Sequence, residues 1–252
     1  MLALLCLLAS FSCAVNAQGI TVSAGSLLSL GAGNITAGCG DLTVAGTLNL
    51  DSGSVSLIDS VAINPGTING GSGALSLSGD WTNAGTFNAQ TSQVNIVDDC
   101  GTAASTISGD TDFYGFSATS SAGKQLQFAA GSTQSFGSSL TLAGSGSNRL
   151  TVRSTAAGSP AFLVLADSAS QNVQYVDVAD SDASRGAAIA LGDPASFNSV
   201  DSGGLVNWFV DVIQSVPVPV NTLPLPMLIL LAAMLAFVAR LKFAPIRKKA
   251  DK

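Results

Sequence analysis

The chain has 252 residues and a formal net charge of −6, with 10 basic and 16 acidic residues. All 16 acids are aspartate, and the sequence contains neither glutamate nor histidine. A helical protein of this size would use Glu, Lys, Arg and Gln as its helix formers. These residues are scarce in this sequence, which excludes a mainly helical protein. Zinc sites built on histidine and serine hydrolases with a histidine base are excluded. The acidic balance excludes a basic nucleic-acid binder.

The N-terminal segment, residues 1–17, has the composition of a secretory signal peptide. It carries no charged side chain, contains a dense apolar run and ends in Val15-Asn16-Ala17. This ending resembles the small-residue cleavage site of signal peptidase. We therefore expect cleavage between Ala17 and Gln18. A buried N-terminal strand or helix is the alternative.

The body, residues 18–216, reads as short strands separated by turns. Triplets that alternate apolar and polar residues recur, among them Leu42-Thr43-Val44, Leu48-Asn49-Leu50 and Leu75-Ser76-Leu77. Residues 173–178 are predicted to form one further strand. Such alternation indicates strands with one buried and one solvated face. Turn formers, chiefly glycine with asparagine, aspartate and proline, separate the triplets. No apolar stripe at helical spacing interrupts this pattern.

The spacing of the triplets decides between the all-β folds. They recur every six to eight residues, whereas sandwiches and barrels use longer strands at a wider spacing. In a parallel β-helix each turn consists of two or three short strands joined by tight corners. We therefore predict an all-β fold, a right-handed parallel β-helix with turns of roughly 20–25 residues. Its aromatic side chains should fill the core rather than form a sugar-stacking platform.

Charge and cysteine content describe the surroundings of this body. It carries four basic residues and 15 aspartates, a net charge of −11. Such a surface attracts neither DNA nor anionic lipid and tolerates divalent cations. Cys39 and Cys100 are its two cysteines. Export to an oxidising compartment favours a disulfide between them, and two separate buried thiols are the alternative.

One short segment has carboxylates at a spacing that partly matches a calcium loop. Asp180, Asp182 and Ser184 occupy positions 1, 3 and 5 of such a loop. Arg185 stands where the loop needs glycine, and Leu191 stands where it needs an acid. An Asx turn that ends a strand is therefore the alternative. Calcium is the one cofactor that the sequence suggests.

A β-helix enzyme that cleaves polysaccharide is the rival interpretation. Glycoside hydrolysis needs two carboxylates about 5–9.5 Å apart, and Asp98 with Asp99 or Asp177 with Asp180 are the nominees. A general acid also needs a raised pKa in a cleft, whereas these aspartates lie in Ser- and Gly-rich turns. We expect no enzymatic activity and assign no catalytic residue.

The C-terminal end has the layout of a membrane anchor. Residues 217–226 form a proline-rich linker, residues 227–239 are uninterrupted apolar sequence, and residues 240–252 form a basic tail. With the four preceding residues the apolar span reaches 17 residues, near the lower limit for crossing a bilayer as one transmembrane helix. Arg240 and Lys242 stop the span, and the positive-inside rule places the tail in the cytoplasm.

Two parts of the sequence resemble known families. The stretch from Gly79-Asp80-Trp81 through Phe113-Tyr114-Gly115-Phe116 to Asn207-Trp208 resembles the repeats of secreted bacterial β-helix proteins of the adhesin type. Asn221-Thr222-Leu223-Pro224, the apolar run and the basic end resemble the C-terminal sorting signals of Gram-negative bacteria, of the PEP or IPTL type. These resemblances imply a cell-surface protein and a sorting protease as a partner.

The sequence thus predicts an exported bacterial surface protein with a single membrane-spanning helix. Its expected role is structural, adhesive or matrix-associated, with polysaccharide or a surface partner as the binding target and no nucleic acid. A polysaccharide-degrading enzyme and a calcium-stiffened scaffold are the alternatives.

Overall fold

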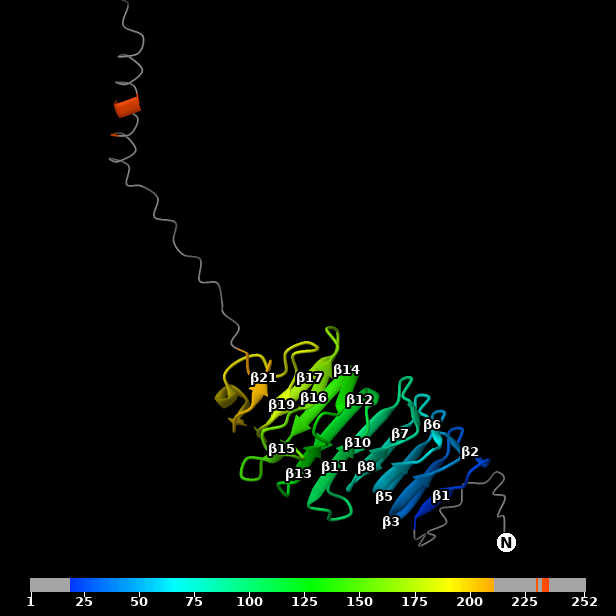
Figure 1. Ribbon diagram of the computed structural model, residues 1–252. Coiled ribbons are helices and arrows are strands. Elements are labelled where there is room, and N and C mark those ends of the chain that lie inside the picture. Colours follow the sequence, from blue (N-terminus) through cyan, green and yellow to red (C-terminus); the bar gives the residue numbers. More distant parts are fainter. Residues whose placement is uncertain (1–18, 211–229, 231–232, 236–252) are drawn as a thin grey trace, which may run out of the picture. The chain divides into compact units, whose positions relative to one another are not determined.

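A computed structural model describes residues 19–210, residue 230 and residues 233–235. Residues 19–210 form a parallel β-solenoid of about 8 turns, in which the chain advances along the axis from β1 to β21 (Figure 1). The prediction of an all-β parallel β-helix is confirmed. Within residues 19–210 the one helix is the short 3-10 turn η1 (Pro194–Phe197).

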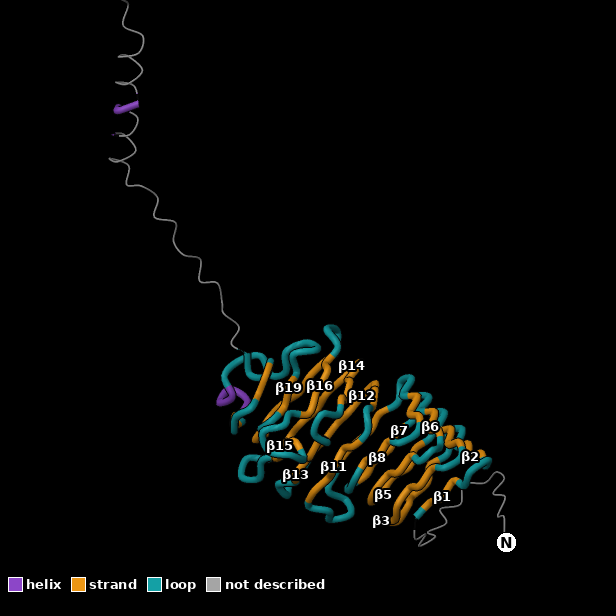
Figure 2. Tube along the Cα trace, in the orientation of Figure 1, coloured by secondary structure: helices purple, strands orange, loops and turns teal. Residues whose placement is uncertain are grey.

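Each turn of the solenoid contributes to three faces, which Figure 2 shows as parallel rows of strands. The first face consists of β1 (Ile20–Val22), the ends of β3 (Asn34–Val44) and β5 (Ser54–Ile63), β8 (Trp81–Asn83), β11 (Ala104–Ser108), β13 (Gln125–Phe128), β15 (Leu150–Ser154), β18 (Val176–Val178) and β20 (Val200–Asp201). The second face consists of β2 (Leu27–Ser29), β4 (Thr47–Asn49), β6 (Thr67–Asn69), β9 (Thr86–Asn88), the starts of β12 (Thr111–Thr119) and β14 (Thr133–Ala143), β16 (Ala161–Leu165), β19 (Ser181–Asp182) and β21 (Leu205–Val206). The third face consists of the starts of β3 and β5, β7 (Ala74–Leu77), β10 (Gln93–Ile96), the ends of β12 and β14, and β17 (Ser170–Gln174).

Several strands differ in length from the predicted triplets. β3, β5, β12 and β14 have 9 to 11 residues, because each continues round a corner through a register shift and so serves two faces. Conversely, the predicted strand over residues 173–178 is divided into β17 and β18. Tyr175 has a left-handed φ of 51° there and forms the corner between them.

The core lies inside the solenoid and consists of the inward residues of the triplets. The register places Leu42 beside Val61 and Val61 beside Trp81, so that equivalent residues of successive turns stack in columns. These three side chains are almost completely buried. Burying each such side chain stabilises the fold by about 1.5–3 kcal/mol, and the stack is therefore the main favourable term in folding.

The middle of the core is aromatic. Trp81 packs against Phe87 and Phe113 with ring centroids 5.0 and 5.4 Å apart, and Phe113 lies 5.0 Å from Phe116. The expectation that aromatic side chains fill the core is confirmed for these residues. Tyr114 differs, because it faces outward with 39% of its surface exposed. One exposed tyrosine does not make a sugar-stacking platform.

Outward residues of the second face form polar ladders. Asn69 donates from Nδ2 to Oδ1 of Asn49, and Asn88 donates in the same way to Asn69, both at 2.8 Å. Thr47, Thr67 and Thr86 form a parallel column two residues earlier in each strand; each column holds one residue per turn. The result is a regular, uncharged hydrogen-bonding surface. We call it the amide ladder; it consists of Asn49, Asn69 and Asn88 together with the adjacent threonine column.

Glycine is required where successive corners touch. A Cβ on Gly53 would lie 2.2 Å from the carbonyl oxygen of Gly33 and 2.9 Å from Cβ of Leu30. Neither contact can be relieved without separating the two turns. Gly146 lies in a wider loop, and a Cβ there would meet no atom within 4 Å.

The terminal predictions fall mostly outside the described residues. These are the signal peptide of residues 1–17, cleavage between Ala17 and Gln18, the linker of residues 217–226, the sorting motif Asn221, Thr222, Leu223 and Pro224, and the stop at Arg240 and Lys242. Residue 230 and residues 233–235, within the expected membrane span, are helical. Across the described parts of the chain no helix is long and apolar enough to cross a membrane.

We expect Gly53→Ala to lower the free energy of unfolding by about 1–3 kcal/mol, the usual cost of overpacking. The matched control Gly146→Ala should change it by less than about 0.5 kcal/mol, because nothing is displaced. Urea unfolding followed by circular dichroism compares the two variants. Equal effects would contradict the close packing of corners.

Candidate functional site

The regular corners are interrupted by one excursion, residues 97–103, which we call the corner strap. It lies at the corner between the third and first faces. The sulfur atoms of Cys100 and Cys39 are joined, with their Cα atoms 5.5 Å apart. The Cys100 N–H donates to Oγ of Ser78 (3.0 Å), and Oγ1 of Thr102 donates to Oδ1 of Asp59 (2.6 Å). Because residues 39, 59 and 78 belong to three successive corners, the strap connects the first four turns of the solenoid.

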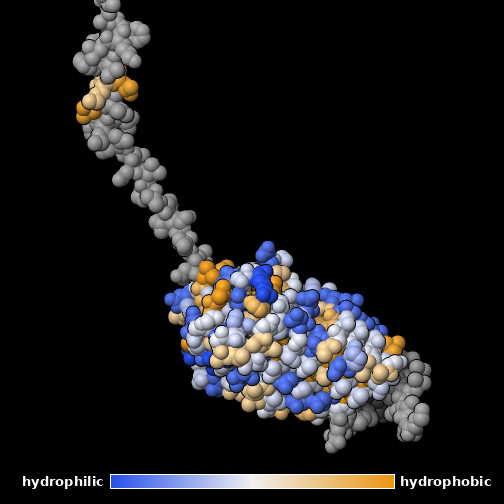
Figure 3. All heavy atoms as spheres, viewed as in Figure 1, coloured by the Kyte–Doolittle hydropathy of each residue, from blue (hydrophilic) through white to orange (hydrophobic). Residues whose placement is uncertain are grey.

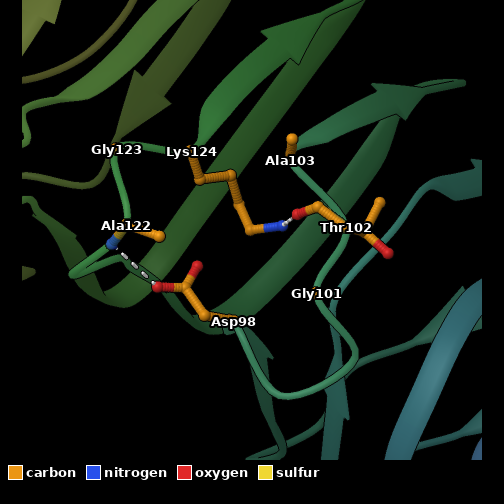
Figure 4. Close-up of a pocket in the computed structure, with 7 residues that line it drawn as sticks. All are labelled: Asp98, Gly101, Thr102, Ala103, Ala122, Gly123 and Lys124. Atoms are coloured by element: carbon orange, nitrogen blue, oxygen red, sulfur yellow. Dashed lines mark hydrogen bonds between the residues drawn. The ribbon is translucent and has the colours of Figure 1, made fainter.

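Lys124, in the next corner, holds the strap from the other side. Its side chain is only 2% exposed. The ammonium Nζ donates to the carbonyl oxygen of Ser78 at 2.6 Å and also to that of Thr102. Figure 4 shows the Lys124 side chain extended across the pocket toward Thr102, with Asp98 on the opposite wall. The lysine therefore ties together corners two turns apart.

Burial and nearby carboxylates act in opposite directions on Lys124. Burial lowers the pKa of its ammonium group below the usual value of 10.5, and this effect is the larger. The carboxylates of Asp98, Asp59 and Asp80 raise the pKa in part. A buried charge needs partners to offset its lost hydration, and the two carbonyls and three carboxylates supply them.

Asp98 organises the neighbouring corner. Its Oδ2 accepts hydrogen bonds from Oγ of Ser120 (3.1 Å) and from the N–H groups of Ser121 (2.9 Å) and Ala122 (3.3 Å). The carboxylate thus takes the place of a backbone acceptor at a turn. This nominee for catalysis is engaged in holding the chain.

Two hollows adjoin the strap. A pocket of about 130 Å³ lies between the strap and Lys124, and a shallow groove of about 400 Å³ runs past Asp98 and Asp99. The pocket is smaller than the 300 Å³ or more that small-molecule sites usually have. The groove is lined by small residues and carries no aromatic side chain on which a sugar could stack. The strap and Lys124 together form a clamp between successive corners.

The residues of the predicted calcium loop make local contacts. Oδ1 of Asp182 accepts the Ser184 N–H at 2.8 Å, which closes an Asx turn. Asp180 has a φ of 53°, and its N–H donates to the carbonyl of Gly203. Among the described residues no three acids or cysteines are gathered as a metal site. These contacts favour the Asx-turn alternative, and calcium binding at Asp180, Asp182 and Ser184 stays a prediction.

Asp177, another catalytic nominee, is held by an ion pair. Its Oδ1 lies 2.8 Å from Nη2 of Arg153 and accepts a hydrogen bond from Oγ of Ser202 at 2.6 Å. Burial raises the pKa of this carboxyl, but the bonds from Ser202 and Arg153 and the charges of Arg153 and Arg149 lower it overall. A carboxylate kept ionised does not act as a general acid at neutral pH.

Sequence reasoning missed Lys124 because nothing in the local pattern marks it. It follows Ser120-Ser121-Ala122-Gly123, a run of turn formers in which a lysine is normally solvated. Its burial depends on the strap, which comes from another turn. The disulfide, by contrast, was one of two stated alternatives for Cys39 and Cys100.

Comparison with known proteins yields no match: no family model, no curated protein and no solved structure is similar to this chain.

We expect Lys124→Met to lower stability at pH 7 by about 1–3 kcal/mol, since the carbonyl of Thr102 loses the Lys124 donor and that of Ser78 keeps only the bond from Oγ of Ser105. Between the lowered pKa of Lys124 and 10.5 the unfolded chain binds more protons than the folded chain. The stability contribution of Lys124 therefore increases as pH rises through this window. Urea unfolding from pH 7 to 10.5 should show this slope in the original protein and a smaller one in Lys124→Met. Parallel pH profiles would contradict the burial of a charged lysine.

Proposed function

We propose that this chain is an exported, membrane-anchored bacterial surface protein whose solenoid serves as a structural and adhesive module. The alternating triplets, the apolar C-terminal run and the basic tail motivate the proposal at the level of sequence. The single observation that carries it is the disulfide between Cys39 and Cys100.

The disulfide supports export because such bonds persist in oxidising compartments and are rare in the cytosol. It closes a loop of 61 residues and clips the strap to the first corner. A link of this span typically contributes about 2–4 kcal/mol. A surface protein without chaperones to refold it gains directly from such a link.

The amide ladder supports the adhesive part of the proposal. Its Asn and Thr side chains repeat once per turn, so neighbouring groups are about 4.8 Å apart along the axis. Such a row offers equivalent donors and acceptors at three successive turns to a hydroxyl-rich polymer. Each of these contacts is weak. Polysaccharide is the partner that suits this surface, since the body of the chain has a net charge of −11 and would repel nucleic acid.

The membrane part of the proposal rests on sequence. Residues 227–239 would serve as the core of a transmembrane helix, and Asn221 to Pro224 would present the sorting motif to a protease of the Gram-negative sorting type. The signal peptide, residues 1–17, would direct the body across the inner membrane. The body would then face away from the cytoplasm.

An enzymatic role has less support from the contacts of the nominated acids. Asp98 accepts three hydrogen bonds from its own corner, and Asp177 is paired with Arg153. Both carboxylates are committed to holding turns together. We therefore place the function on the outer faces of the solenoid.

Cells that produce the full chain should hold it in the membrane fraction, with the body open to added protease and with Cys39 and Cys100 resistant to alkylation until reduced. Deletion of residues 223–252 should release the body into the periplasm or medium with the disulfide intact. Fractionation and non-reducing gels measure both. A full chain found in the cytosol with free thiols would refute the proposed export.

Removal of the amide ladder by the triple change Asn49→Ala, Asn69→Ala and Asn88→Ala should weaken co-sedimentation with extracellular polysaccharide of the host cell. We expect a graded loss of roughly tenfold, because each contact is worth only about 0.5–1.5 kcal/mol. The matched control carries Ser76→Ala, Asn95→Ala and Ser117→Ala on the third face and should bind normally. Absence of binding by the original protein would refute adhesion while leaving export untouched.

A further inference from the structure

The two ends of the solenoid have similar strand edges but different exposed side chains. Among the described strands, β1 and β2 pair on one side only, and so do β20 and β21. The last turn presents three large apolar side chains to solvent, Leu191 (52% exposed), Val206 (47%) and Val210 (39%). The first turn presents one, Leu27 (67%). The exposed apolar side chains therefore distinguish the C-terminal end, and the strand edges do not.

The three side chains of the last turn belong to one end of the body. The Gly192 N–H donates to the carbonyl oxygen of Val210 at 2.9 Å, which places Leu191 beside the last described residue of the body. Val206 lies on β21, the last strand of the second face. Figure 3 shows apolar atoms gathered on the surface at this end. We call Leu191, Val206 and Val210 the apolar rim.

Closure of the core does not account for the apolar rim. Trp208 and Phe209 are nearly buried in the last turn, with ring centroids 5.8 Å apart. The Trp208 indole N–H donates to Oγ of Ser181 (3.1 Å). Both rings belong to the hydrophobic core, whereas none of the three rim residues does. Exposed apolar side chains that are grouped in this way mark surfaces for contact with a protein or a membrane.

Charge also differs along the body. Residues 18–123 carry eight aspartates and no basic residue, whereas residues 124–210 carry four basic residues and six aspartates. Asp182, which is aligned with Val206, and Asp193, which follows the strand of Leu191, each accept an N–H group of their own turn. An anionic membrane surface therefore repels the first part of the body more strongly than the last part.

We infer that the apolar rim is a lipid-contact surface, which holds the last turn of the solenoid against the bilayer that carries the C-terminal anchor. The inference rests on the proposed membrane anchoring. Residues 211–222 join Val210 to the apolar span that begins at Leu223, and even a fully extended chain of this length reaches only about 45 Å. The tether thus keeps the rim, rather than the first turn, close to lipid.

The tether also explains why a small apolar surface is enough. Three half-exposed side chains would bind a bilayer weakly from free solution, because membrane affinity increases with the apolar area that is buried. Tethering makes the contact intramolecular, and the effective concentration of lipid at the rim is then high. The contact would orient the solenoid. Its acidic first turns and the amide ladder would point away from the lipid, where a polymer can reach them.

Photo-crosslinking of the full chain in vesicles tests this surface. The probe is a phosphatidylcholine vesicle in which some lipids carry a diazirine near the glycerol end of an acyl chain. A protease that cuts before aspartate then separates residues 182–192 and 201–210, which carry the rim, from residues 211–250, which carry the expected membrane span. We expect lipid adducts on these three peptides and none on the peptide that carries Leu27.

The triple change Leu191→Ser, Val206→Ser and Val210→Ser should lower the adducts on residues 182–210 tenfold or more, relative to those on residues 211–250. The matched control carries Leu27→Ser and Tyr114→Ser, which remove the other two large exposed apolar side chains of the described body. This control should leave the adducts unchanged. Both variants should keep the original melting temperature, because every replaced side chain is at least 39% exposed.

Each other outcome overturns the inference in a distinguishable way. Adducts on residues 211–250 alone refute lipid contact by the last turn and leave the proposed anchor standing. Absence of adducts on every peptide refutes the anchor, and with it the premise of the inference. Equal labelling of the peptide that carries Leu27 shows that lipid touches the body without preference for the rim. Rim adducts that survive the triple change show that the contact does not depend on these side chains.

Discussion

The hydrogen bonds between successive turns are the constraint on which the rest of the molecule depends. They fix the spacing of parallel strands at about 4.8 Å, so every side chain lies directly over its equivalent in the next turn. Inward positions must then be apolar, as in the column of Leu42, Val61 and Trp81. Outward positions must tolerate an identical neighbour, which uncharged Asn and Thr do better than charged residues. Where the backbones of successive corners touch, the residue must be small, as at Gly53.

The corner strap is a place where the chain connects several turns at once through a covalent bond. A stack of identical turns interacts only with its neighbours, so a link across several of them makes their opening cooperative. Cys39 and Cys100 supply the covalent part of this link and Lys124 the polar part. Burying a lysine is costly, and here the cost is offset by the corner carbonyls of Ser78 and Thr102. The acidic neighbours Asp59 and Asp98 serve this clamp.

The function that we propose lies on a repeated outer surface of the solenoid rather than in a cleft. Of the aspartates nominated for catalysis, Asp98 and Asp177 are engaged in holding turns together. The hollows beside the strap are small or shallow. The amide ladder is the outer surface that we propose for contact with a polymer. It follows from regularity, because it repeats an amide at three successive turns.

The sequence by itself determined the fold class, because alternation at period two shows which residues face the core irrespective of their distant partners. It located most strands for this reason, and it offered the Asx turn of Asp182 and the disulfide as stated alternatives. Only the tertiary structure decided that Val173 to Val178 bends at Tyr175, that β3 and β14 continue round a corner, and that Lys124 is buried. Each of these depends on contacts between residues some 20 or more positions apart, which no local pattern records.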